Sequence, residues 1–366
     1  MHDCCNASSS NGPWVASMAE PLTGELEAVL KLRCDVDLRH LNTFHVSARA
    51  RYFTEISSAE QLPALCRWLQ QHPMPYMLIG QASNILFRQD YPGLIIEFNL
   101  KGIRVEAETA EHVDIAVNGG EIWHDLVCHT LQQRWYGLEN LSLIPGTVGA
   151  APVQNIGAYG VELSRFVRYV DAVELASGTS RRFSLEDCEF GYRTSIFKQA
   201  LRDRYLITCV GLRLSKEPQL VLSYPALREA LRGVPENELT PQRVSDTVCA
   251  IRRSKLPDPA SLGNAGSFFW NPQITPERFA ELKRDYPELP GYPDGEQIKV
   301  PAAWLIERCG WKGFRDGDVG VHQEHALVLV NHGEATGAAL VALSERIQDS
   351  VERRFGIRLV PEVRIV

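Results

Sequence analysis

The chain has 366 residues, of which 45% are hydrophobic and 23% charged, and its formal net charge at pH 7 is −7. Such a chain can bury two or three domain cores, and its composition is ordinary for a globular protein. The acidic balance gives no electrostatic footprint for nucleic acid, and no apolar run approaches the ~18 residues of a membrane span. We therefore expect neither nucleic acid nor a membrane as a partner.

The nine cysteines are scattered, and only Cys4 and Cys5 are close in sequence. Single thiols without C-x-x-C or zinc-like spacing are typical of reduced proteins, so we expect a cytoplasmic protein without a metal site. The first residues have neither a basic nor an apolar signal-peptide region, so we expect no signal peptide. We interpret residues 1–38 as an N-terminal extension, partly disordered, in which Met18 is an alternative start.

Alternating apolar residues over 42–56 predict strands at the start of the folded part. An amphipathic helix capped by Ser58 follows, and two prolines end it before a strand at 75–80. The stretch GQASNILF, Gly80 to Phe87, then places glycine, small residues and Asn directly after a strand. This stretch is a candidate phosphate-contacting turn, or it simply reverses the chain.

Strand patterns continue over 94–118, with a helix from about Glu121, and return at 167–184 and 205–214. A turn is expected at Ser177-Gly178, between two of these strands. Many short strands of this kind predict an antiparallel-rich α+β domain and not a doubly wound one.

Ile144 to Glu162 reads IPGTVGAAPVQNIGAYGVE and contains four glycines and two prolines. That density of backbone breakers predicts a loop, yet Ile144, Val148 and Ile156 make it too apolar for a solvated linker. A buried loop must satisfy its backbone N–H and C=O groups. Either a ligand such as a pyrophosphate accepts from its amides, or the loop is a buried crossover between subdomains. The residues alone leave both alternatives open.

The sequence pattern changes near residues 216–222, from predicted strands to predicted helices, and we place a domain boundary there. Helices are predicted at 225–231, 244–253, 276–284 and 302–309. A strand at 325–331, a helix from the cap Thr336 to Gly356, and a strand over 357–366 follow.

Several motifs are absent or misleading. Neither a Rossmann G-x-G-x-x-G nor a P-loop is present. Ser195 and Lys198 fit the S-x-x-K pattern of penicillin-recognising enzymes, but the partner motifs are missing and we treat the match as coincidence. His322 and His325 lack a third ligand, so we interpret them as polar histidines and not as a metal site.

Six motifs in order support a resemblance. They are NTF at 42–44, the loop at 144–162, FGYRTSIFK at 190–198, KLPDP at 255–259, GNAGSF at 263–268 and PEVRIV at 361–366. On these motifs the chain resembles the UDP-N-acetylenolpyruvoylglucosamine reductase family over nearly all of residues 40–366. Tyr224, in LSYPAL, resembles the tyrosine loop of the longer family subtype, which closes over bound nucleotide.

The resemblance implies an α+β fold with two FAD-binding subdomains of the vanillyl-alcohol-oxidase type, at 39–100 and 101–217. A substrate-binding α+β domain at 218–366 would follow. It also implies noncovalent FAD, NADPH as hydride donor, and reduction of UDP-N-acetylglucosamine enolpyruvate to UDP-N-acetylmuramate for peptidoglycan. We expect a monomer.

The resemblance assigns three catalytic residues. Arg193 would face the substrate carboxylate, where a permanently charged planar guanidinium suits a developing enediolate. Glu362 would assist there, as a hydrogen-bond donor if protonated, and Ser267 would be the proton donor. Without the resemblance, each has a structural alternative: a surface ion-pair partner, an edge-strand charge and a turn residue, respectively.

The resemblance also assigns contacts. Expected FAD contacts are Gly80, Ser83, Asn84, Ile144, Pro145, Gly146, Thr147, Gly149, Gly157 and Tyr159. Expected substrate contacts are Tyr224, Arg252, Lys255, Asn271 and Arg364, whose basic and polar groups suit a diphosphate and a carboxylate.

Two positions depart from the family pattern. Ala82 stands where the early turn usually has a second glycine, so it requires either a negative φ or more room near the FAD phosphates. Trp270 stands where Lys usually precedes Asn-Pro, and it either weakens anion binding or packs. The rival readings are another FAD-dependent oxidoreductase on this scaffold and a non-catalytic nucleotide-sugar-binding protein.

Overall fold

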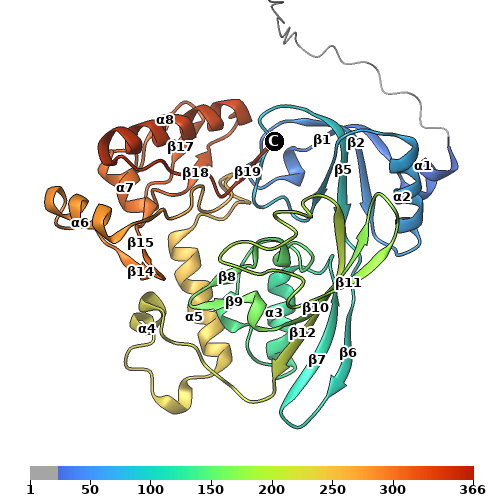
Figure 1. Ribbon diagram of the computed structural model, residues 1–366, viewed down its shortest axis with the longest axis horizontal. Coiled ribbons are helices and arrows are strands. Elements are labelled where there is room, and N and C mark those ends of the chain that lie inside the picture. Colours follow the sequence, from blue (N-terminus) through green and yellow to red (C-terminus); the bar gives the residue numbers. More distant parts are fainter. Residues whose placement is uncertain (1–23) are drawn as a thin grey trace, which may run out of the picture.

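The computed structural model describes residues 24–366 (Figure 1). Most of the predicted N-terminal extension, with Cys4, Cys5 and Met18, therefore lies outside the described residues. The end of that extension is structured: it forms helix α1 (Glu25–Leu30) and strand β1 (Arg33–Asp37). Since β1 is hydrogen-bonded to β2, we propose that the first subdomain begins at about residue 25.

The first subdomain is built on a mixed sheet of order β1-β2-β5-β3. Its other elements are β2 (Arg49–Ile56), α2 (Gln61–Gln71), β3 (Tyr76–Ile79) and β5 (Tyr91–Phe98). β2 and β3 run parallel to β5, while β1 is antiparallel to β2. The predicted cap of α2 is wrong: the helix begins after Glu60 without a side-chain cap, and the Gln61 side chain accepts from the Ser58 amide.

The second subdomain is a fully antiparallel sheet of order β11-β10-β12-β7-β6. It comprises β6 (Ile103–Glu108), β7 (His112–Asn118), α3 (Trp123–Gln132), β10 (Val167–Glu174), β11 (Ser180–Ser184) and β12 (Tyr205–Ser215). The predicted turn at Ser177-Gly178 is confirmed, and Gly178 takes a φ of +75°. The antiparallel-rich α+β prediction is confirmed.

Ile144–Glu162 is a loop, as predicted. Its only regular pieces are the 3-10 turn η3 (Ala151–Gln154) and the short hairpin β8 (Gly157–Ala158) and β9 (Val161–Glu162). Val148 is fully buried, and Ile156 is 6% exposed, so the loop belongs to the core of the second subdomain.

The residues that follow β12 pack on this loop before the chain leaves it. The helices α4 (Pro225–Ala230) and α5 (Pro241–Lys255) share a small apolar core with Tyr159. α5 also packs against the 3-10 turn η2 (Glu139–Leu141). The boundary predicted at 217/218 remains a proposal, and α4 and α5 lie against the second subdomain (Figure 1).

The remaining C-terminal part holds two small sheets and three helices around the largest buried cluster. Its elements are β13 (Gln273–Ile274), α6 (Pro276–Asp285), β14 (Tyr292–Asp294), β15 (Gln297–Lys299), α7 (Ala302–Arg308), β16 (Arg315–Asp316), β17 (Val319–Val321), β18 (Leu329–Asn331) and α8 (Gly337–Phe355). The predicted cap of α8 is confirmed, because the Thr336 side chain accepts from the Ala339 amide and Gly356 ends the helix with a φ of +63°.

The chain then returns to the first subdomain. Strand β19 (Arg364–Ile365) runs parallel to β4 (Ile85–Leu86), which directly follows the turn at 80–84. Phe44 and Leu86 of the first subdomain are likewise part of the C-terminal core. The C-terminal part and the first subdomain are thus joined by a strand pair and by shared apolar packing.

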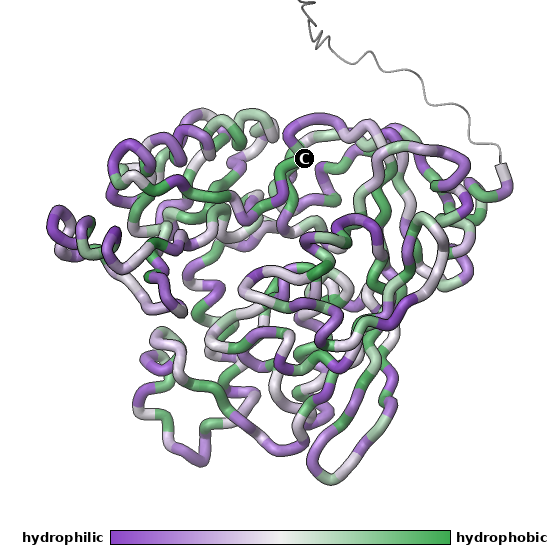
Figure 2. The backbone as a smooth tube through the Cα atoms, viewed as in Figure 1, coloured by the Kyte–Doolittle hydropathy of each residue, from purple (hydrophilic) through white to green (hydrophobic). Residues whose placement is uncertain are grey.

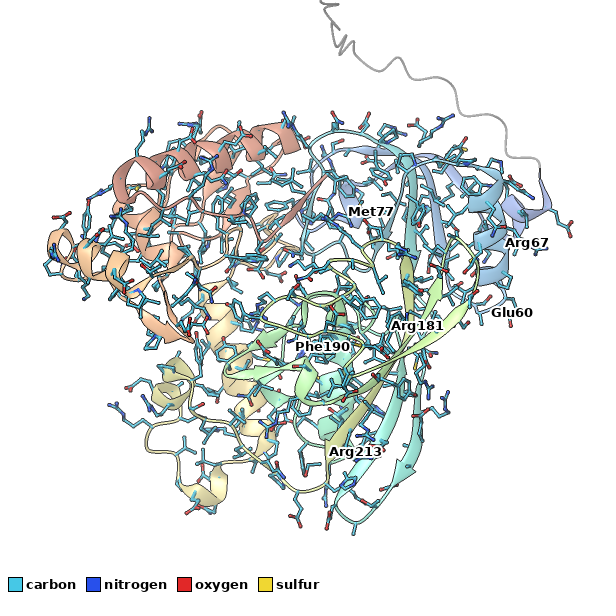
Figure 3. The ribbon with its side chains drawn as sticks, in the orientation of Figure 1. Glu60, Arg67, Met77, Arg181, Phe190 and Arg213 are labelled. Carbon is cyan, nitrogen blue, oxygen red and sulfur yellow. The ribbon has the colours of Figure 1, made fainter. Side chains whose placement is uncertain are left out.

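Hydrophobic and hydrophilic residues alternate along the helices (Figure 2). In residues 24–366 no helix is both long and apolar enough to cross a membrane. The same division holds for side chains: Met77 of β3 is completely buried, whereas Arg181 of β11 is exposed. Both residues are labelled in Figure 3.

Candidate active site

The segment 360–366 lies between two regions that the sequence assigns to catalysis and to FAD. On one side, the Glu362 amide donates to the Phe268 carbonyl at 2.8 Å, next to Ser267. On the other side, the Asn84 side-chain amide donates to the Glu362 carbonyl at 3.2 Å, and the Arg364 amide donates to the Asn84 carbonyl at 3.0 Å. The backbone of Glu362 therefore connects the serine segment with the early turn.

Arg193 and Glu362 face each other. Arg193 Nε lies 3.9 Å from Glu362 Oε1, and both side chains are about three-quarters shielded from solvent. Burial raises the pKa of Glu362, and the charges of Arg193 and Lys198 oppose that rise. The structure thus brings together two of the three predicted catalytic residues in one contact.

Two special backbone positions make this contact possible. Arg193 has a φ of +54°, a left-handed conformation that costs a non-glycine residue roughly 1–2 kcal/mol. Gly157 lies so close to it that an added Cβ would be 3.1 Å from Arg193 Nη1. The absence of a side chain at Gly157 therefore leaves room for the guanidinium.

Ser267 is half-buried and follows Gly266, whose φ is +70°. The Gly266 amide donates to Asn264 Oδ1 at 2.8 Å, and Asn264 itself is almost completely buried. A Cβ on Gly266 would meet nothing within 4 Å, so the space beside the serine is open. The third predicted catalytic residue is thus on a fixed turn with room for a ligand.

The turn 80–84 has unpaired backbone donors. The amides of Gln81, Ala82, Ser83 and Asn84 donate no hydrogen bond within the described part of the chain. Ala82 has a φ of +43°, which excludes the first of its two predicted alternatives, a negative φ, and leaves the second, more room near the FAD phosphates. Successive amides around a left-handed residue form a concave anion site, and the donors therefore fit a diphosphate.

This turn contacts the loop 144–149. A Cβ on Gly80 would lie only 2.6 Å from Thr147 Oγ1, and the Gly146 amide donates to Gln81 Oε1 at 2.9 Å. Gly146 has a φ of +117°, and a Cβ built on it would be 3.6 Å from Ser83 Oγ. The two predicted cofactor segments therefore form one surface, which presents side-chain hydroxyls and unpaired amides.

The loop is held from behind by helices α3 and α5. Leu143, with a φ of +58°, precedes the loop, and its amide donates to His124 Nδ1 at 3.0 Å. Its carbonyl accepts from Arg252 Nε at 3.1 Å. Burial lowers the pKa of His124, which keeps the imidazole neutral and able to accept. Gly149 is fixed as well, because its amide donates to the Gly119 carbonyl at 2.7 Å.

Tyr159 connects the loop to the predicted tyrosine loop. Its ring lies edge-on to the ring of Tyr224, with the centroids 5.1 Å apart, and its φ is +49°. The buried Asn140 side chain donates to the carbonyls of Tyr159 and Val221, at 2.9 and 2.8 Å. Tyr224 is 44% exposed, so it is placed at the surface above Tyr159.

Arg252 and Lys255 lie on the last turns of α5. Burial lowers the pKa of Arg252, and its Nε is taken by the Leu143 carbonyl. In residues 24–366 Arg252 has no carboxylate within ion-pair distance, so its terminal nitrogens remain for an anion. Lys255 is exposed at the end of the helix.

The other two predicted substrate contacts have partners inside the protein. Asn271 Oδ1 accepts from the Ala302 amide at 2.9 Å and so caps α7. Arg364 forms a two-pronged ion pair with Asp203, at 2.9 and 2.7 Å. The structure thus gives both residues a structural contact, and their roles toward a substrate stay predictions.

Four residues at the site were not singled out from the sequence: Gln81, His124, Asn140 and Lys198. All four bond main-chain groups, so their residue types carry no recognisable chemical signal. Lys198 lies in a motif that was set aside as a coincidental S-x-x-K match.

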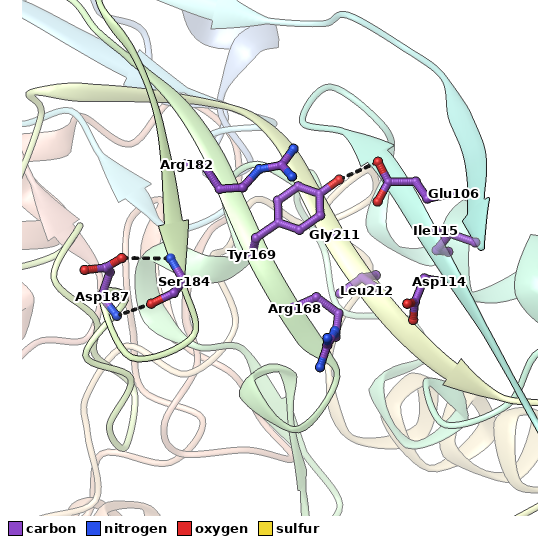
Figure 4. Close-up of a pocket in the computed structure, with 10 residues that line it drawn as sticks. All are labelled: Glu106, Asp114, Ile115, Arg168, Tyr169, Arg182, Ser184, Asp187, Gly211 and Leu212. Atoms are coloured by element: carbon purple, nitrogen blue, oxygen red, sulfur yellow. Dashed lines mark hydrogen bonds between the residues drawn. The ribbon is translucent and has the colours of Figure 1, made fainter. Parts of the chain in front are cut away.

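A separate hollow of about 410 Å³ lies on the outer face of the antiparallel sheet (Figure 4). Its polar groups pair with one another: the Tyr169 hydroxyl donates to Glu106 at 2.8 Å, and the Arg182 guanidinium lies 3.6 Å over the Tyr169 ring. Arg213 and Asp114 form a further two-pronged pair. We interpret this hollow as a solvated sheet face.

No cluster of three side chains that could hold a metal ion occurs in residues 24–366.

Comparisons with known proteins show which family the chain resembles. Residues 258–366 match the C-terminal domain of UDP-N-acetylenolpyruvoylglucosamine reductase, and residues 50–184 match an FAD binding domain. The reductase of that name from Chromobacterium violaceum is 48% identical over 92% of this chain and 99% of its own length. The reductase from Pseudomonas aeruginosa is 46% identical over 91% of this chain and 98% of its own.

A solved structure agrees in fold. The UDP-N-acetylenolpyruvylglucosamine reductase of Thermus caldophilus is similar to this chain with a TM-score of 0.63, at 22% identity, over 91% of this chain and 99% of that one.

Proposed function

The chain belongs to the UDP-N-acetylenolpyruvoylglucosamine reductase family, and from this premise we propose how its residues divide the work. The protein is an FAD-dependent oxidoreductase that reduces UDP-N-acetylglucosamine enolpyruvate to UDP-N-acetylmuramate with NADPH, in peptidoglycan synthesis. Of the rival readings, another flavin oxidoreductase and a non-catalytic binding protein, neither accounts for matches that cover nearly the whole chain.

The turn 80–84 and the loop 144–149 would hold the cofactor. Four unpaired amides in the turn, with the hydroxyls of Ser83 and Thr147, fit the diphosphate of FAD. A Cβ on Gly80 would clash with Thr147 Oγ1 at 2.6 Å and one on Gly146 would contact Ser83 Oγ at 3.6 Å, whereas one on Gly149 would meet the carbonyls of Gly119 and Ile207 at 3.0 Å. The predicted role of Gly80 is thus supported by the cradle itself, and that of Gly149 by the packing of the loop. When bound, FAD supplies the hydride, from its N5 to C3 of the enolpyruvyl group, after reduction by NADPH.

The catalytic residues would manage the charge that the hydride leaves on the substrate. Addition at C3 moves an electron pair from the C2–C3 double bond toward C2 and the carboxylate. Arg193 would stabilise that charge, because its guanidinium is fixed in the site and only partly solvated. Glu362, whose pKa is raised by burial, would donate a hydrogen bond to the same oxygens when protonated.

Ser267 would complete the reaction. Its hydroxyl proton forms the new C2–H bond, and solvent returns a proton to the serine oxygen afterwards. The net change is one hydride and one proton added across the double bond. A serine hydroxyl is a weak acid, so this step depends on the strong basicity of the intermediate, and general acid catalysis typically contributes ~10²–10⁴ in rate.

Substrate binding would use the cationic end of α5. The unpaired nitrogens of Arg252 and the exposed Lys255 suit a diphosphate, and Tyr224 would close over it. We also propose that Asn271 and Arg364 contact the substrate. They would do so through the side-chain atoms that do not bond Ala302 and Asp203. We also propose that the protein is a monomer. Its scattered single cysteines support a place in the cytoplasm.

The observation that carries the proposal is the position of Glu362 between the serine segment and the turn with unpaired amides. The purified protein should be yellow, and it should oxidise NADPH only when UDP-N-acetylglucosamine enolpyruvate is present. A yellow protein that ignores this substrate would favour the rival oxidoreductase. A colourless protein that takes up no added FAD would favour the binding protein.

A further inference from the structure

Lys198 contacts the backbone of Arg193 and the ring of Trp270, which lies in the same segment as Ser267. Its ammonium donates to the Arg193 carbonyl at 3.1 Å. The same ammonium lies 4.8 Å from the ring centroid of Trp270, which follows Ser267 by three residues. Both partners are electrically neutral, so within the described chain no carboxylate in ion-pair contact cancels the charge of Lys198.

The turn that carries Lys198 is fixed. Ser195 is completely buried, and its hydroxyl donates to the Val153 carbonyl at 2.7 Å and accepts from the Phe197 amide. The Lys198 amide donates to the Ser195 carbonyl at 3.1 Å. The S-x-x-K spacing thus has a structural meaning here: the serine anchors the turn to the central loop, and the lysine extends from that turn into the site.

The contact with Arg193 acts on a strained residue. A left-handed arginine persists only where its surroundings hold it, and the Lys198 ammonium holds its carbonyl. Rotation of the Arg193 backbone would carry the guanidinium away from Glu362. A charged donor to a carbonyl is also a stronger hydrogen bond than a neutral one.

Burial lowers the pKa of Lys198, and the charge of Glu362 opposes that change. Trp270 offers the ammonium a neutral aromatic face. A second lysine at this position, as the family pattern has it, would bring another ammonium close to the first. The indole face instead attracts the cation, an interaction of about 0.5–2 kcal/mol in proteins generally. The Trp270 amide donates to the Val360 carbonyl at 3.0 Å, so the backbone that carries this ring is joined to the segment that carries Glu362.

We propose that Lys198 is a positioning residue of this reductase: it holds Arg193 in its left-handed conformation and adds a positive charge beside Glu362. The inference rests on the proposed function. The charged groups around it are Arg193 and Arg202 on its own loop and Glu362 on the opposite segment. Lys198 therefore helps to keep the catalytic arginine and carboxyl in register while the substrate carboxylate is present.

The test compares the two half-reactions in rapid mixing. Lys198→Met keeps the apolar stem and removes the charge and the donor. We expect reduction of bound flavin by NADPH and the FAD dissociation constant to stay within about threefold. Reoxidation by substrate should slow by ~10²-fold, the effect typical of a misplaced catalytic group. Glu362 is proposed to act when protonated, so its ionisation would appear as the fall of the reoxidation rate at high pH. In Lys198→Met this fall should move to higher pH, because a neighbouring positive charge is lost and the pKa of Glu362 rises.

Two further variants separate position from charge. Lys198→Arg keeps both, and it should recover most of the reoxidation rate. Lys198→Gln keeps a neutral donor, so it should lie between the methionine and arginine variants, and it serves if Lys198→Met does not fold. The matched control is Lys216→Met, which removes a lysine paired with Glu108 at the distant edge of the sheet.

The outcomes are distinct. Equal slowing of both half-reactions, an arginine variant as slow as the methionine one, or an unmoved pH profile would each overturn the positioning role. If wild-type flavin is not reoxidised by the substrate at all, the proposed function fails before the variants are compared.

Discussion

The side-chain amide of Asn84 donates to the main-chain carbonyl of Glu362 over 3.2 Å, although 278 residues separate them in the chain. Asn84 belongs to the turn whose amides are proposed to hold FAD, and Glu362 is a proposed catalytic residue. The cofactor turn is therefore bonded directly to the backbone of the catalytic segment. A displacement of the turn must therefore displace the catalytic segment, and the reverse. The following predictions test the residues of these two parts and their neighbours.

Ser267→Ala should separate proton transfer from cofactor reduction. We expect NADPH to reduce the flavin at the wild-type rate, while reoxidation by substrate slows by at least ~10² because the proton donor is gone. Rapid-mixing absorbance of the flavin measures both. Ser261→Ala, an exposed serine that bonds the Asp258 carbonyl in the same loop region, is the control and should change neither rate by more than about threefold. Wild-type reoxidation in Ser267→Ala would remove the assigned role.

Gly80→Ala should weaken FAD binding by a steric route. Its Cβ would be 2.6 Å from Thr147 Oγ1, so the turn and the loop must separate. Overpacking typically costs 1–3 kcal/mol, and we expect the FAD dissociation constant to rise about 10–100-fold, as measured by flavin fluorescence. Adding Thr147→Ala leaves the new methyl only an ordinary contact at 3.4 Å. The double variant should therefore bind better than the two single effects predict, and strict additivity would contradict the clash.

The neutral form of His124 should hold the loop 144–149 in place, because its Nδ1 accepts the hydrogen bond from the Leu143 amide. Burial lowers its pKa from the usual 6.5, with Arg252 and Arg253 acting in the same direction and Asp125 against it. The bond from the Leu143 amide is therefore intact above 6.5 and is lost as the pH falls through the lower folded value. FAD affinity should fall over that range in the wild type.

Variants of His124 test this expectation. His124→Leu should raise the FAD dissociation constant about tenfold at neutral pH, since one hydrogen bond of roughly 1–1.5 kcal/mol is lost. His124→Asn keeps an acceptor near the Nδ1 position, so it should bind FAD well and show no acid loss. His129→Leu, further along the same helix, is the control. An asparagine variant with the acid loss of the wild type would point to another group.

Glu362→Gln should change the pH dependence of stability. The folded pKa of Glu362 is raised above its usual 4.5 by burial. Its stabilising contribution is therefore complete below pH 4.5 and is lost as the pH rises through the folded value. The variant cannot ionise, so it should match the wild type in acid and become relatively more stable at higher pH. Urea unfolding at a series of pH values would show this divergence, and parallel curves would be inconsistent with a raised pKa.

Arg364 should behave as one half of a pair with Asp203. The two side chains are 29% and 30% exposed, so we expect each of Arg364→Gln and Asp203→Asn to destabilise the fold by only about 1 kcal/mol. The double variant should lose no more than either single one, and both should change the KM for substrate alike. A KM that rises much more in Arg364→Gln would instead support the direct substrate contact predicted from the sequence.

Motif order and strand patterns were enough to predict the α+β class, the loop at 144–162 and the cap of α8. These features depend on local composition and on long matching motifs. The two alternatives for the loop are compatible in the structure, since it packs in a subdomain core and also borders the turn with unpaired amides.

What the sequence did not predict depends on contacts between distant residues. The parallel pairing of β19 with β4 cannot be read from two-residue strands. The roles of His124 and Asn140 depend on main-chain groups that the fold brings to them. The sequence left two alternatives open for Ala82, because tertiary contacts and not the local sequence decide whether a non-glycine residue takes a left-handed φ.

The long separation between Asn84 and Glu362 also bears on how the protein is made. Every residue proposed to contact FAD precedes Glu362 by about two hundred positions or more, and chains are synthesised from the N-terminal end. During translation the cofactor cradle therefore leaves the ribosome long before the carboxyl group is added to the chain. Joining β19 to β4 requires closure of a very long loop, which makes it a slow and late event. The proposed catalytic contact between Arg193 and Glu362 can therefore form only after the last residues of the chain have been made.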